Sequence, residues 1–87
     1  MIIMVKKILS DGSECRKCKE VNDFLKEKQL LDRIDKIVYA DPRNPNEEGM
    51  KLAKYWSMKR APFFIIEEEG RTVIYSSVME LIRKELQ

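Results

Sequence analysis

Short apolar runs alternate along this chain with segments in which apolar residues recur every three or four positions. The apolar runs predict β-strands at 2–9, 34–40, 63–66 and 71–75. The periodic segments predict helices at about 15–30, about 45–56 and from 78 onward. The order β-α-β-α-β-β-α indicates an α/β protein whose four-stranded mixed sheet is flanked by helices. The first βαβ unit should have parallel strands, and the last two strands should form an antiparallel hairpin.

Two short sequences predict where helices begin. Asn44-Pro45-Asn46-Glu47 offers an N-cap, a proline at the first helical position and a glutamate three residues after the cap. Ser77, followed three residues later by Glu80, is a second capping box and should open the terminal helix. The faces that we expect to be buried are Cys18, Val21, Phe24 and Leu25, then Leu52, Ala53 and Trp56, and finally Val78, Leu81, Ile82 and Leu86. We expect Tyr55 to pack against the sheet together with Trp56.

Length and composition favour a single domain over residues 1–87. A chain of 87 residues has no room for a second core, and 44% apolar residues is ordinary for a globular protein. No segment approaches the ~20 apolar residues of a membrane span. The first apolar run has no basic region before it and no small-residue cleavage site after it, so we expect a cytoplasmic protein without a secretory signal.

The charged residues exclude several classes of function. A formal net charge of +2 gives no support for nucleic-acid binding, which usually needs a strongly basic face. The chain contains no histidine, which excludes Ser-His-Asp and Cys-His catalysis and any histidine metal ligand.

The two cysteines, Cys15 and Cys18, form a Cys-Arg-Lys-Cys sequence at the first strand-to-helix junction. Two intervening residues bring the sulfurs close enough to bridge, and a helix N-terminus stabilises a thiolate. Arg16 and Lys17 should also lower the pKa of Cys15. We interpret the pair as redox-active. The alternatives are half of a metal site completed by a second chain and a non-catalytic scaffold.

A proline stands immediately before the third predicted strand, in the sequence Ala61-Pro62-Phe63. Proline has no N–H group, so it suits the beginning of a strand. With the element order, the chain length and the placement of the cysteines, this proline makes the chain resemble the short glutaredoxin-like proteins of the thioredoxin superfamily. The resemblance implies that Cys15 is the nucleophile and Cys18 the resolving thiol. It also implies a cis peptide at Ala61-Pro62, where the backbone of Ala61 would bind an extended substrate.

The implied function is that of a thiol–disulfide oxidoreductase that reduces protein disulfides through a mixed disulfide. Arg60, beside the proline, is a candidate for binding a substrate carboxylate. We expect a monomer without a resident cofactor or metal, a separate thiol or protein as electron donor, and no membrane partner. The rival function is a thioredoxin-fold binding module, or a protein whose cysteines bridge a metal or an iron–sulfur cluster. Ser76-Ser77 stands where glutaredoxins usually have Gly-Gly, so we expect weak activity with glutathione.

Overall fold

The computed structural model describes residues 1–86, and position 87 of the predicted single domain lies outside the described residues. A four-stranded sheet is formed by β1 (Ile2–Lys7), β2 (Lys36–Ala40), β3 (Phe63–Glu68) and β4 (Arg71–Tyr75). Its strand order is β2-β1-β3-β4. β1 runs parallel to β2 and antiparallel to β3, which pairs in an antiparallel hairpin with β4. The predicted mixed sheet, its parallel first unit and its hairpin are confirmed.

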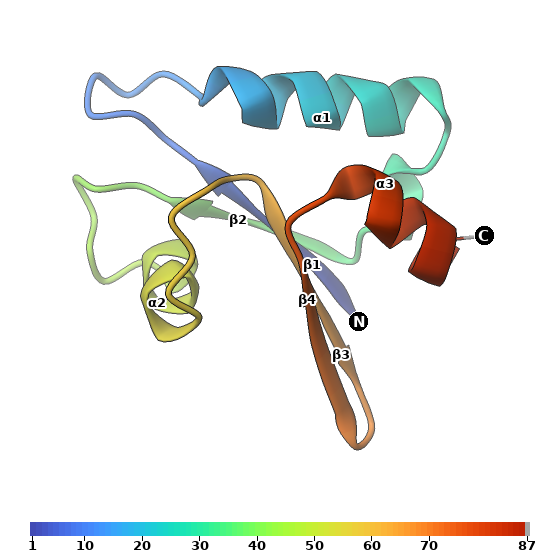
Figure 1. Ribbon diagram of the computed structural model, residues 1–87. Helices are drawn as coiled ribbons and strands as arrows, with labels where there is room; N and C mark the ends of the chain where they lie inside the picture. The colour runs from blue at the N-terminus through green and yellow to red at the C-terminus, as the bar shows by residue number, and fades with distance from the viewer. Residues whose placement is uncertain (87) are drawn as a thin grey trace.

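Helices cover both faces of the sheet (Figure 1). They are α1 (Arg16–Glu27), α2 (Glu48–Tyr55) and α3 (Val78–Leu81), and a 3-10 turn lies at Leu31–Arg33. The chain continues from α3 into a π-helical turn, Ile82–Leu86. α1 and α3 lie on one face of the sheet and α2 on the other, which gives three layers (Figure 1). Within residues 1–86, no helix has the length and apolar character that crossing a membrane requires.

The sheet carries an apolar core on each face because its strands are covered on both sides. Met4 and Phe64 are fully buried in the cluster under α1 and α3. Val5 and Ile65, the next residues along the same strands, are fully buried in the cluster under α2. Successive side chains of a strand point to opposite faces, so one apolar run supplies both clusters.

The inner helix faces largely match the prediction. Those residues of the predicted faces that are buried are Cys18, Val21, Leu25, Leu81 and Leu86, while Phe24, Leu52, Ala53, Trp56, Val78 and Ile82 are half-buried. Tyr55, which we expected to pack against the sheet, is 76% exposed, so that prediction is wrong. Its ring instead meets the edge of the Trp56 ring, with centroids 4.9 Å apart.

Several predicted boundaries are too generous. β1 ends at Lys7, two residues early, because the chain turns back and Ile8 forms an isolated bridge with Glu14. α1 ends at Glu27, and Gln29 follows with a positive φ of 59° that stops the helix. The second strand begins at Lys36 rather than at position 34.

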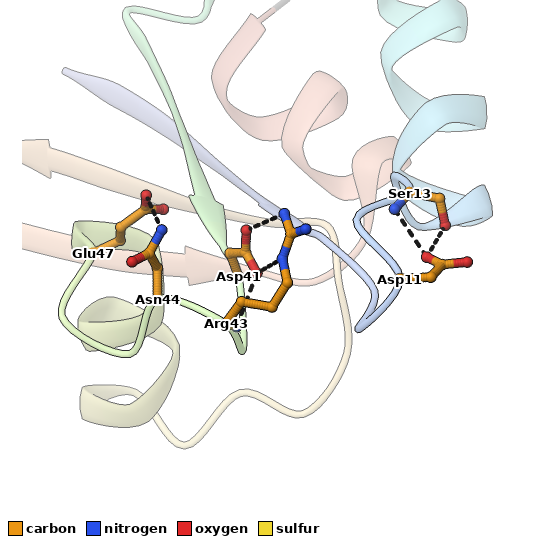
Figure 2. Close-up of polar contacts among 6 residues, drawn as sticks. All are labelled: Asp11, Ser13, Asp41, Arg43, Asn44 and Glu47. Atoms are coloured by element: carbon orange, nitrogen blue, oxygen red, sulfur yellow. Dashed lines mark hydrogen bonds and ion pairs between the residues drawn. The ribbon is translucent and has the colours of Figure 1, made fainter.

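The predicted capping box at Asn44 is wrong. α2 begins at Glu48, with Glu47 as its N-cap and no side-chain cap. The N–H of Asn44 donates to the carbonyl of Asp41, and the N–H of Glu47 donates to the carbonyl of Asn44. These two consecutive turns take the place of the first helical turn, and the Asn44 amide donates to the Glu47 carboxylate over 3.2 Å (Figure 2). The N-cap predicted at Ser77 is confirmed, since Oγ of Ser77 accepts from the N–H of Glu80.

Gly49 lets α2 lie very close to β2. A methyl group at this position would lie 2.7 Å from the backbone nitrogen of Ala40 and closer still to the carbonyl group of Tyr39. Gly49 is buried, and its lack of a side chain is what permits this approach. The α2 layer is therefore fixed against the strand that runs beside β1.

Candidate active site

Both cysteines lie at the start of α1, beside the carboxyl end of β1. Cys15 is the N-cap residue and is half-buried, whereas Cys18 lies in the first turn and is fully buried. Both are free thiols. The N–H of Cys15 donates to the carbonyl of Lys7 over 3.0 Å, and the N–H of Lys7 donates to Sγ of Cys18 over 3.3 Å. The last residue of β1 therefore holds both cysteines in place.

The loop between β1 and α1 folds back on itself and carries the chain into the helix. The Asp11 carboxylate accepts from the N–H and the hydroxyl of Ser13, over 2.9 and 2.6 Å (Figure 2). Ser13 lowers the pKa of Asp11 through these bonds. Gly12 has a φ of +90°, which favours glycine, and a methyl group there would lie 2.8 Å from Nη1 of Arg43. The loop is thus shaped by its own residues and packs against the next one.

Arg43 comes from the loop between β2 and α2. It donates from Nε and Nη2 to both carboxylate oxygens of the buried Asp41, over 3.0 and 2.8 Å (Figure 2). The Arg43 side chain and backbone N–H hold the pKa of Asp41 below its usual range. Since the same guanidinium lies against Gly12, it joins the two loops at the carboxyl ends of β1 and β2.

The pKa values of the two thiols are shifted in opposite directions. Burial acts to raise the pKa of Cys15, but the backbone N–H groups of Cys18 and Lys17, the Cys18 thiol and the Lys7 charge outweigh it, so the pKa is lowered. Burial raises the pKa of Cys18 to about 11, and the Cys15 thiol and the charges of Cys15 and Glu14 act in the same direction. At neutral pH Cys15 is therefore the better nucleophile, and Cys18 stays protonated.

The two cations between the cysteines occupy different places. The Arg16 side chain is 94% exposed and lies 3.3 Å from a Glu20 carboxylate oxygen one turn further along α1. Lys17 lines the cavity in front of Cys15 and acts on that thiol through its backbone N–H. The side-chain charge that lowers the pKa of Cys15 comes from Lys7, which the sequence reasoning missed. Lys7 is the last residue of the strand that precedes the cysteines, and this position in the sequence indicates a charge close to them.

A buried cation in β1 pairs with the residue that precedes Cys15. Lys6 is 6% exposed, and its Nζ lies 2.9 Å from the buried Oε1 of Glu14 without hydrogen-bond geometry. The same ammonium lies 5.7 Å from the centroid of the Tyr39 ring, a cation–π contact. This ion pair fixes Glu14 immediately before Cys15, so it also holds the entrance to α1.

A cavity of about 550 Å³ opens in front of Cys15. Its lining brings together the predicted residues Cys15, Lys17, Arg60, Ala61 and Pro62. Ala61-Pro62 is a cis peptide, as predicted, and Pro62 is buried while Ala61 is half-buried. Cys18 and Arg16 are not part of the lining: Cys18 is buried behind Cys15. The other residues of the lining include Ser77, the N-cap of α3. They are Lys7, Val21, Lys59, Phe64, Ser76, Ser77, Val78 and Met79.

No group of three or more histidine, cysteine, aspartate or glutamate side chains suited to holding a metal ion occurs within residues 1–86.

Comparison with known protein families found no family model that matches the chain. Comparisons with the curated proteins and with the solved structures found no match either. The fold and the site together define a small α/β protein with two free thiols of unequal acidity at the junction of β1 and α1.

Proposed function

We propose that this protein is a thiol–disulfide oxidoreductase of the thioredoxin superfamily, of the short glutaredoxin-like form, acting in the cytoplasm. The observation that carries the proposal is the inequality of the two thiols. Cys15 faces a cavity and has a lowered pKa, while Cys18 is buried behind it with a raised pKa. A nucleophile and a resolving thiol need this division, because the attacking thiol must be ionised and accessible.

The reaction begins when the Cys15 thiolate attacks one sulfur of a substrate disulfide. A new S–S bond joins Cys15 to the substrate, and the other substrate sulfur leaves as a thiolate that takes up a proton. Cys18 then loses its proton and attacks Sγ of Cys15, which releases the second substrate thiol and leaves a Cys15–Cys18 disulfide. The substrate gains two electrons and two protons. A separate thiol or protein donor returns two electrons to the enzyme.

The cis segment supplies the substrate-binding part of the proposal. Ala61 and Pro62 line the cavity beside Cys15, and Ala61 is accessible enough to offer its backbone to an extended substrate. Arg60 is exposed at the same cavity, and in this proposal its guanidinium pairs with a substrate carboxylate.

The test is to mix the reduced protein with excess 2-hydroxyethyl disulfide and to follow its mass. The natural chain should lose two hydrogens and both free thiols. Cys18→Ser should stop at a stable adduct, and Cys15→Ser should remain unmodified over the same time. Iodoacetamide at neutral pH should label Cys15 first.

Two results would overturn the proposal. One is a Cys15→Ser variant that reacts as fast as Cys18→Ser, since Cys15 would then not be the nucleophile. The other is a purified reduced protein that holds a metal ion or a cluster between two chains through these cysteines, which would favour the bridging function.

A further inference from the structure

A second cavity lies beside the one in front of Cys15, on the α2 side of the sheet. It has a volume of about 510 Å³. Its floor and walls are formed by buried residues of the sheet core and half-buried residues around α2, namely Val5, Ala40, Met50, Ala53, Met58 and Phe63. An apolar surface of this size is large enough to receive a ligand group and favours an apolar one.

Four cations stand around this apolar lining: Lys7, Lys54, Lys59 and Arg60. All four are exposed, and no acidic side chain is among the lining residues. No ion pair within residues 1–86 includes any of the four, whereas Arg16, Lys36 and Arg43 are paired. Their charges are therefore available to a negatively charged ligand.

The two cavities share part of their lining. Lys7, Lys59, Arg60 and Ala61 line both of them. A substrate whose disulfide reaches Cys15 therefore has the apolar, cation-rimmed cavity within reach across the Lys59–Ala61 segment.

We infer that the α2-side cavity is a docking site for the disulfide-containing polypeptide itself, and that it selects a segment in which an apolar side chain is flanked by acidic residues. The apolar side chain enters between Met50, Ala53 and Met58, and the carboxylates pair with the four cations. This inference rests on the proposed function, because the docked segment belongs to the disulfide substrate. An open cavity with a charged rim suits a side chain of an extended segment, whose backbone remains in solvent.

The rate test uses three peptides of equal length, each with one cysteine activated as a mixed disulfide with 2-mercaptoethanol. One carries Leu-Glu-Glu next to the cysteine, one Leu-Lys-Lys and one Ser-Glu-Glu. The natural protein should react with the first at least threefold faster than with either other peptide, and the preference over the basic peptide should shrink in high salt. Equal rates for the three peptides would overturn the inference.

Lys54→Glu and Lys51→Glu form a matched pair of variants. Both lysines are exposed on α2, but only Lys54 lines the cavity. Lys54→Glu should lower the acidic-to-basic rate ratio at least threefold, and Lys51→Glu should leave the ratio unchanged. A Lys51→Glu variant with the same loss would show that the preference follows overall charge, which contradicts a local site.

The methionines give a readout that does not depend on rates. Met50 and Met58 line the α2-side cavity, Met79 lines the cavity in front of Cys15, and Met4 is fully buried in the core. In the trapped mixed disulfide of Cys18→Ser with the Leu-Glu-Glu peptide, the ¹³C-methyl signals of Met50 and Met58 should shift, while that of Met4 should not. Shifts at Met79 alone would contradict docking in the second cavity.

The uncharged 2-hydroxyethyl disulfide separates the two possible failures. If the natural protein does not react with it, the proposed function fails. If it reacts but shows no peptide preference and no shifts at Met50 and Met58, only the docking site fails.

Discussion

Lys7 donates its backbone N–H to Sγ of Cys18, and the same residue lines the cavity in front of Cys15. One residue thus contacts the buried thiol through its backbone and acts on the accessible thiol through its charge. Because the backbone bond survives any substitution except proline, the two effects can be separated.

Lys7→Met should raise the pKa of Cys15, since it removes the positive charge and keeps an unbranched side chain only one atom shorter. We expect iodoacetamide to alkylate Cys15 about threefold more slowly at pH 7, with a pH profile displaced upward. Arg16→Met is the control and should change the profile less, because the Arg16 side chain points into solvent beside Glu20. A larger effect of Arg16→Met would show that the residues between the cysteines, and not Lys7, are the main cause of the lowered pKa of Cys15.

Cys18 should make the stability of the reduced protein fall in alkali. Its folded pKa of about 11 lies above that of an unfolded cysteine, about 8.5. The protonated Cys18 thiol therefore stabilises the folded state fully below pH ~8.5, and this contribution is lost as the pH rises through about 11. In that interval the difference in unfolding free energy between the natural chain and Cys18→Ala should shrink by up to about 1.4 kcal/mol per pH unit. Urea unfolding between pH 7 and 11 measures it, and a constant difference would contradict the raised pKa.

Gly49→Ala should destabilise the protein by about 2 kcal/mol or more, because a methyl group would meet the backbone of Tyr39 and Ala40. Gly70→Ala is the matched control. Gly70 has a φ of +72° but nothing within 4 Å of the added methyl group, so only the conformational cost of about 1 kcal/mol applies. Thermal unfolding of both variants compares a steric effect with a purely conformational one. A larger loss in Gly70→Ala would mean that α2 can move away from β2 at little cost.

Asp41→Asn should remove part of the sensitivity of the fold to acid. The Arg43 side chain lowers the pKa of Asp41, so the stabilisation is present above the pKa of an unfolded aspartate, about 3.9, and is lost as the pH falls through the lower folded value. The variant should be less stable than the natural chain at pH 6, and the two should converge toward pH 2. Asp32→Asn, at an exposed position, is the control and should change the stability little at pH 6. Denaturant unfolding at several pH values checks both.

The sheet, the helix order and the buried helix faces follow from local patterns. Leu25 and Leu81 are fully buried because the apolar positions of their helices recur at helical spacing. Ser77 caps α3 because its side-chain oxygen accepts from the N–H of Glu80, three residues later. This bond needs no other segment of the chain. Patterns of this kind are visible in sequence because the interacting groups are neighbours.

The wrong prediction at Asn44 and the unpredicted roles of Lys6 and Lys7 have a common cause. They depend on contacts between segments distant in sequence, or on local hydrogen bonds that compete with a helix cap. Asn44 does not cap α2, because the carboxylate of Asp41 accepts from Arg43 and holds the chain in a turn. Lys6 lies in an apolar strand and is buried because Glu14, on the returning loop, supplies the opposite charge. The role of Lys7 depends on the same loop bringing Cys15 back to the end of β1. None of these three pairings has a periodic signature.

The raised pKa of Cys18 has a consequence for the order of events in the proposed reaction. Burial is its main cause, but the neighbouring Cys15 thiolate contributes by repelling a second negative charge. When Cys15 becomes bonded to substrate sulfur, that charge disappears and Cys18 gives up its proton more readily. In the proposed reaction the second thiol therefore becomes more reactive once the first has captured a substrate. Until then Cys18 remains a protonated, buried group, so in the proposed reaction Cys15 alone meets disulfides that arrive from solution.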